Sequence, residues 1–142
     1  MPRCPLRPLA SLLLLLAIAS CDDATGTVPD AAVGLYDLTR VNGQLLPVRI
    51  VATAEQQVDI TGGRLNVRAN GSYRESRDSR ITDAAGTRTG TAFTEGTLHV
   101  SGATLEMRER EGGSYPGTFV DGDISYTIPV GEGGISFTYE KP

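Results

Sequence analysis

The chain has 142 residues, of which 39% are hydrophobic and 21% are charged, and its formal net charge is −4. An acidic chain without clustered positive charge is a poor partner for nucleic acid, and we expect none to bind. Its length suffices for one domain.

The first predicted element is a secretory signal peptide. Arg3 and Arg7 precede an apolar run of about ten residues, roughly half of what a membrane-spanning helix needs. The run closes on Ile18-Ala19-Ser20-Cys21. This sequence resembles the lipobox of bacterial lipoproteins, in which an aliphatic residue and two small residues precede a cysteine. The resemblance implies cleavage before Cys21, diacylglycerol on its thiol and acylation of the new amino terminus.

The resemblance also predicts a location. Two or more acyl chains attach a protein stably to a bilayer, so we expect Cys21 to hold the mature chain on the exported side of a bacterial cell-envelope membrane. The alternative is a signal peptide whose cysteine carries no lipid. Asp22 leaves open whether the inner or the outer membrane is the destination.

The mature chain must fold without a disulfide. Removal of residues 1–20 takes away Cys4, leaves 122 residues and changes the net charge to −6, since Arg3 and Arg7 leave too. A chain of this size can bury a core without covalent links. Residues 21–32 are mostly small, polar and aperiodic, and they predict a flexible tether behind the lipidated cysteine.

From residue 33 onward, short alternating segments are separated by glycine-containing turns, a pattern typical of consecutive antiparallel hairpins. The predicted turns are Asn42-Gly43, Gly62-Gly63, Asn70-Gly71, Ser101-Gly102, Asp121-Gly122 and Gly133-Gly134.

Each segment between these turns has one apolar face. The apolar rows are Leu46, Val48 and Ile50; Leu65 and Val67; Leu98 and Val100; Leu105 and Met107; Ile124, Tyr126 and Ile128; and Ile135, Phe137 and Tyr139. We predict an all-β domain over residues 33–142, an antiparallel up-and-down meander that closes into a small barrel of eight or nine strands. An open two-sheet β-sandwich is the alternative.

The opening of this domain carries a second resemblance. Gly34-Leu35-Tyr36 leads through Val41-Asn42-Gly43 to Leu46-Pro47, as in the first hairpin of small lipocalin-like domains of bacterial lipoproteins. Residues 65–73 and 96–107 resemble later hairpins of the same group. The resemblance implies a barrel that binds a small apolar or amphipathic ligand. The chain departs from true lipocalins because Tyr36 replaces a tryptophan, no C-terminal helix is predicted and the chain is shorter.

The sequence contains no recognisable catalytic or metal-binding constellation, and we predict a protein that is not an enzyme and has no cofactor. The only histidine, His99, lies on the polar side of its segment, where we expect it to be exposed. Glu106, Glu109 and Glu111 fit a solvated strand end, and Asp121-Gly122-Asp123 fits a hairpin turn.

Residues 74–80 are the one segment that carries charges on both faces. Arg74, Asp78 and Arg80 share one face, and Glu75 and Arg77 share the other. Either this hairpin extends past the barrel rim, or one row points into a wet barrel mouth where arginines receive an anionic ligand. In the second interpretation, the candidate ligand-binding residues are Tyr73, Arg77, Arg80 and Phe93.

Two functions follow from these predictions. The first is a membrane-anchored, non-enzymatic barrel that binds a small apolar, amphipathic or anionic ligand. The alternative is a structural or protein-interaction module of the cell envelope, with a fully packed barrel and a protein partner.

Overall fold

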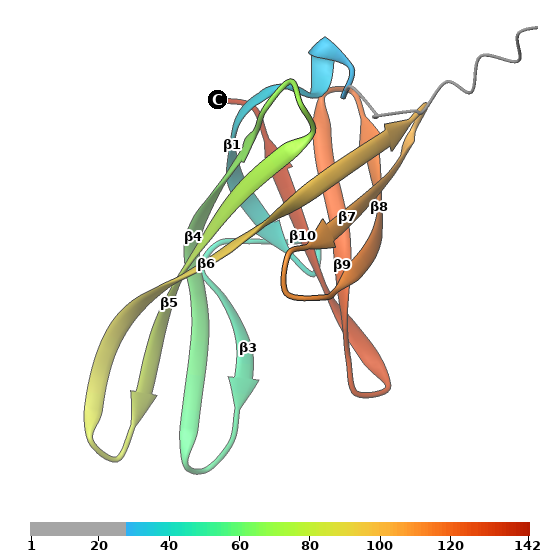
Figure 1. The fold of residues 1–142 in the computed structure, drawn as a ribbon. Helices are drawn as coiled ribbons and strands as arrows, with labels where there is room; N and C mark the ends of the chain where they lie inside the picture. The colour runs from blue at the N-terminus through green and yellow to red at the C-terminus, as the bar shows by residue number, and fades with distance from the viewer. Residues whose placement is uncertain (1–27) are drawn as a thin grey trace, which may run out of the picture.

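The computed structural model describes residues 28–142, so the predicted signal peptide, Cys21 and the first part of the predicted tether lie outside the described residues. Ten β-strands and one short 3-10 helix make up the described chain (Figure 1). In order, they are η1 (Asp30–Ala32), β1 (Gly34–Val41), β2 (Gln44–Leu45), β3 (Val48–Ala52), β4 (Gln56–Val67), β5 (Ser72–Asp83), β6 (Gly86–Ser101), β7 (Thr104–Glu109), β8 (Ser114–Val120), β9 (Asp123–Val130) and β10 (Gly133–Glu140).

Eight of these strands form a closed antiparallel barrel. The sheet order is β2-β1-β10-β9-β8-β7-β6-β5-β4-β3, and an additional pairing of β1 with β4 closes the ring. In that closing pairing, Tyr36 lies opposite Leu65 and Gly34 lies opposite Val67. The predicted up-and-down barrel is therefore confirmed, and the β-sandwich alternative is wrong.

The barrel core contains side chains from every predicted apolar row and, in addition, Tyr36, Leu38 and Val41 of β1. Every row contributes at least one buried side chain, because alternate residues of each strand point inward. The largest fully buried side chains include those of Tyr36, Leu65, Met107, Phe137 and Tyr139. Each such side chain contributes on the order of 2 kcal/mol through burial, so this core stabilises the fold.

Three strands continue beyond the barrel. β4 and β5 have 12 residues each and β6 has 16, but β1 pairs with β4 only over residues 64–67 and β7 pairs with β6 only over residues 96–101. The remaining parts form a four-stranded sheet with β3, which projects from one end of the barrel (Figure 1). We call this sheet the extension; it contains β3 and residues 56–63, 77–83 and 86–92.

Four of the six predicted glycine turns connect strands, and two were predicted wrongly. Gly62-Gly63 lies inside β4, next to a register shift between Ile60 and Gly62. A Cβ atom on Gly63 would lie 2.5 Å from the carbonyl oxygen of Ser76, so glycine permits close strand contact there instead of a turn. Gly133-Gly134 begins β10, and the turn before it is formed by Gly131 and Glu132.

The N-terminal segment packs on the barrel end opposite the extension (Figure 1). Val28 and Ala32 are buried in the core, and the Tyr36 hydroxyl donates a hydrogen bond of 2.9 Å to the Ala32 carbonyl. The Lys141 ammonium donates to the Ala31 carbonyl at 2.6 Å. Residues 28–32 therefore belong to the packed domain, which corrects the predicted tether boundary at residue 32.

Candidate functional site

The barrel interior holds a buried carboxylate. Tyr73, Glu75 and Arg77 alternate along β5 and face inward, and Glu75 is only 1% exposed. The Tyr126 hydroxyl donates a 2.5 Å hydrogen bond to Glu75 Oε1, and the Tyr139 hydroxyl donates to the same oxygen. Between residues 28 and 142, no buried side-chain nitrogen or oxygen lacks a hydrogen-bond partner. The carboxylate is therefore well accommodated despite its burial.

Arg77 supplies the compensating charge. Its Nε lies 3.5 Å from Glu75 Oε1, and its guanidinium carbon lies 4.9 Å from the centroid of the Phe137 ring. Its Nη2 donates to the Thr94 hydroxyl at 3.5 Å, and 20% of its side chain is exposed. Arg77 thus lies at the barrel end that bears the extension, with its charge directed at Glu75. We call Glu75, Arg77, Tyr126 and Tyr139 the Glu75 cluster.

The two tyrosine hydroxyls of the cluster resist ionisation. Burial, followed by the negative charge of Glu75, raises the pKa of the Tyr126 hydroxyl and of the Tyr139 hydroxyl far above the usual value of about 10. Both hydroxyls therefore stay protonated near neutral pH and act as hydrogen-bond donors. Burial, the largest single influence, lowers the pKa of Arg77, but the attraction of Glu75 together with that of the other acidic groups around it gives a net upward shift.

Aromatic rings fill the space around this cluster. The Tyr126 ring stacks against Phe137 with centroids 5.6 Å apart and lies nearly parallel to Tyr139 at 6.3 Å. Ile124 and Met107 are fully buried in the same core. In the described part of the chain, these side chains belong to one buried cluster inside the barrel.

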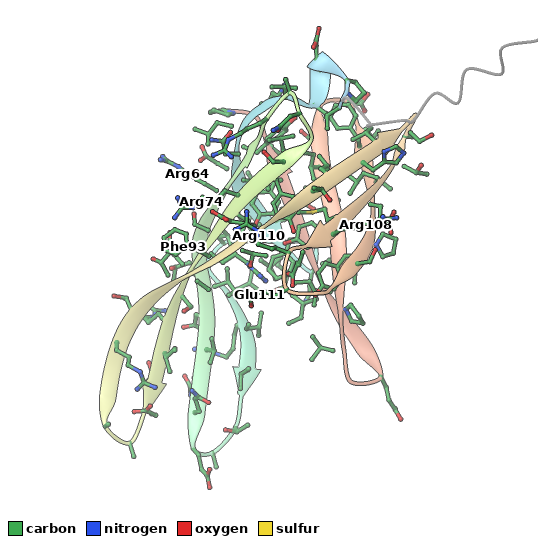
Figure 2. The ribbon with its side chains drawn as sticks, in the orientation of Figure 1. Arg64, Arg74, Phe93, Arg108, Arg110 and Glu111 are labelled. Atoms are coloured by element: carbon green, nitrogen blue, oxygen red, sulfur yellow. The ribbon has the colours of Figure 1, made fainter. Side chains whose placement is uncertain are left out.

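The outer surface carries the most exposed aromatic ring. Phe93 is 61% exposed, and the Arg74 guanidinium carbon lies 4.9 Å from the centroid of its ring. Glu95 forms ion pairs with both Arg74, at 3.8 Å, and Arg110, at 3.0 Å. Figure 2 labels Arg74, Phe93 and Arg110 in this region. A hollow of about 270 Å³ is lined by Phe93, Thr94, Glu95, Glu109, Arg110 and Glu111. This surface carries both positive and negative side chains, and Arg74 and Arg110 are already paired with Glu95.

The four candidate ligand-binding residues do not form one site. Tyr73 and Arg77 lie on the inner face of β5, whereas Arg80 lies on the opposite face, where its Nη2 is 2.9 Å from Asp59 Oδ2. Phe93 lies opposite Ser76 in the unbroken β5–β6 register, which places its ring outside the barrel. The structure thus brings Tyr73 and Arg77 together and separates them from Arg80 and Phe93.

Sequence reasoning missed the role of Glu75, although a signal was present. The alternation that makes Tyr73 part of the apolar row also puts Glu75 and Arg77 on that row. A neighbouring cation on the same face, two residues away, is what a buried carboxylate requires. His99, by contrast, is exposed as predicted.

Between residues 28 and 142, no three histidine, cysteine or acidic side chains gather as metal ligands would. In the same range, no helix has the length and apolar character to cross a bilayer. No protein-family model matches the chain, and comparison with curated proteins and with solved structures finds no similar protein. The resemblances to lipoproteins and to lipocalin-like domains therefore stay predictions.

Proposed function

We propose that this chain is an exported bacterial lipoprotein whose barrel is a packed interaction module of the cell envelope. The observation that carries the proposal is the set of large aromatic side chains that are buried inside the barrel together with the compensated Glu75. A barrel of eight strands is just wide enough for side chains to fill or for one small ligand; where side chains fill it, binding uses the outside.

The position of the N-terminal segment supports an orientation. Val28 is packed at the barrel end opposite the extension, and residues 22–27 can span at most about 20 Å when fully extended. A lipid on Cys21 would therefore keep this end of the barrel near the bilayer. The extension would then point away from the membrane, where it is accessible to a partner.

A second candidate function is the binding of a small anionic or amphipathic ligand at the open barrel end. It is favoured by the partial exposure of Arg77 beside the Phe137 ring. However, the Arg77 charge already faces Glu75, so an anion would compete with a buried carboxylate for the same cation.

Native mass spectrometry separates these two functions. We expect residues 22–142 to have the same mass before and after denaturation, and to take up nothing from a mixture of fatty acids and isoprenoids. A mass excess released on unfolding would contradict the packed module and support the ligand-binding barrel.

The lipid anchor is tested on the full chain expressed in a bacterium. We expect wild-type protein in the membrane fraction with the mass of an acylated Cys21 terminus. Cys21→Ser should abolish both, whereas the control Cys4→Ser should change neither, because Cys4 leaves with the signal peptide. An unmodified wild-type Cys21 would refute the anchor.

A further inference from the structure

One edge of the extension has no strand beside it. The Arg110 N–H donates to the Glu95 carbonyl at 2.8 Å, and from Gly86 to Thr94 the only strand paired with β6 is β5. On the other side of the strand, the Leu98 N–H donates to the Gly71 carbonyl. Because backbone groups alternate in direction along a strand, the N–H and C=O groups of Thr87, Thr89, Thr91 and Phe93 face this edge. We call residues 86–94 the free β6 edge.

The free β6 edge carries little of the protection that edge strands usually have, since Arg88 is its only charged residue. It contains no proline and no register shift, and its residues from Gly86 to Phe93 are all exposed. The opposite edge of the extension is β3, which has five residues, follows Pro47 and has a register shift between Arg49 and Val51. Short length, proline and bulges discourage pairing at β3, whereas β6 is open to another strand.

We propose that the free β6 edge pairs with the same edge of a second copy, antiparallel and around a two-fold axis near Thr91. The pairing joins two extensions into one continuous sheet. The inference rests on the proposed function, because it assigns the binding role to the outside of the molecule. An antiparallel edge is self-complementary in length, so with the axis at Thr91 both copies use residues 87–95, and the Glu95 carbonyl keeps its hydrogen bond from Arg110.

The side chains along the edge are compatible with this two-fold pairing. With Thr91 opposite its own copy, Thr89 lies opposite Phe93 and Thr87 lies opposite Glu95. No two like charges then face each other, and threonine–threonine and aromatic–threonine pairs are favourable neighbours across strands. The pairing also covers the Phe93 ring, which is 61% exposed in the single chain.

The expected dimer is weak. The pairing adds about eight backbone hydrogen bonds, but an edge of this length buries less than the roughly 800 Å² per partner of a standard stable interface. The acidic charge of each copy opposes association further. We therefore expect a dimer that dissociates on dilution below about 100 μM.

Sedimentation equilibrium of residues 22–142, which contain the whole described core, tests the proposal. Between about 10 μM and 1 mM, we expect the mass to rise from that of a monomer toward that of a dimer. Thr91→Pro should keep the protein monomeric without lowering its melting temperature, because only an outward N–H is lost. Thr91→Lys should also keep the protein monomeric, because it places two like charges opposite each other. This second variant tests the proposal even if the proline variant fails to fold.

Thr97→Lys is the matched control, since Thr97 is exposed on the same face of β6 but lies where β7 already pairs. It should dimerise as the wild type does. Thr91→Cys should form a disulfide-linked dimer under mild oxidation with copper phenanthroline, because the axis brings the two copies of residue 91 together. Thr97→Cys should not, because residue 97 lies away from its copy. Residues 22–142 contain no other cysteine, so each variant has a single thiol. A wild-type monomer at 1 mM, or a dimer that survives both Thr91 variants, would overturn the proposal. If the protein is a monomer and native mass spectrometry finds no bound ligand, only the edge pairing is refuted. If native mass spectrometry finds a bound ligand, the packed module is refuted.

Discussion

The barrel and the extension share the three strands β4, β5 and β6 and differ in what covers them. Along β6, Leu98 is 2% exposed within the barrel and Phe93 is 61% exposed where the extension begins. Hydrogen-bond ladders run through both regions without interruption in the β5–β6 pairing. Continuous backbone pairing therefore does not decide where stability resides; a second layer of side chains does. We expect the extension to open locally at a lower free energy than the barrel.

Alkaline pH should break the barrel first. All five tyrosines of the chain lie in the barrel part, at Tyr36, Tyr73, Tyr115, Tyr126 and Tyr139. Since the folded pKa values of Tyr126 and Tyr139 are raised, their stabilising contribution is complete below pH 10 and is lost above it. Ionisation of these two hydroxyls in the unfolded chain should lower the free energy of unfolding by about 3 kcal/mol in total at pH 11. Urea unfolding at pH 8 and 11 measures this loss, and an equal free energy of unfolding at the two pH values would contradict it.

A pair of truncations compares the two regions directly. Leu65→Ala removes a fully buried side chain from the barrel and should lower the free energy of unfolding by about 3 kcal/mol. Ile81→Ala removes a half-exposed side chain from the extension and should cost less than about 1 kcal/mol. Chemical denaturation of both variants provides the comparison, and equal losses would mean that the extension is as well covered as the barrel.

A second pair separates the inner from the outer face of β5. Arg77→Ala leaves the buried Glu75 without its cation and should cost about 2 kcal/mol, somewhat less than a fully buried pair because Arg77 is partly exposed. Arg74→Ala removes exposed contacts to Glu95 and Phe93 and should cost less than about 0.5 kcal/mol. The melting temperatures of the two variants decide the matter; a larger loss for Arg74→Ala would argue against the assigned role of Arg77.

The smallest effect is expected from acid, and it should fall on the extension. Hydrogen bonds from Arg49 and Arg80 lower the pKa of Asp59. The stabilising contribution of Asp59 is therefore present above its unfolded pKa of about 4 and is lost as the pH falls through the lower folded value. The stability difference between wild type and Asp59→Asn should accordingly shrink between pH 6 and pH 2.5. A constant difference would show that the two arginines do not act through the carboxylate charge.

Much of the barrel was predictable because its information is local. Alternation along each strand identified rows such as Ile124, Tyr126 and Ile128, and the Asn-Gly and Asp-Gly pairs identified turns. Gly62-Gly63 misled the prediction because glycine also serves close strand contact, which depends on the neighbouring Ser76 carbonyl. The sequence alone does not show which strand will lie beside Gly63.

The candidate site was predicted less well because it depends on where the barrel closes. β1 pairs with β4 only from residue 64 onward, so the rim runs through β5 close to Arg77. Alternation along β5 puts Glu75 and Arg80 on opposite faces, but it does not show which face points inward or where along β5 the barrel ends. The long-range contacts of Glu75 with Tyr126 and Tyr139, from two strands far along the chain, are equally invisible in the sequence.

The contact between Lys141 and the Ala31 carbonyl has a practical consequence, because Lys141 is the only lysine of the chain. If the amino terminus of Cys21 is acylated, this side chain is the sole primary amine of the mature protein. An amine-reactive dye would then label one defined position without mutagenesis. The label would sit at the barrel end that carries η1, away from the extension, and would leave the free β6 edge chemically untouched (Figure 1).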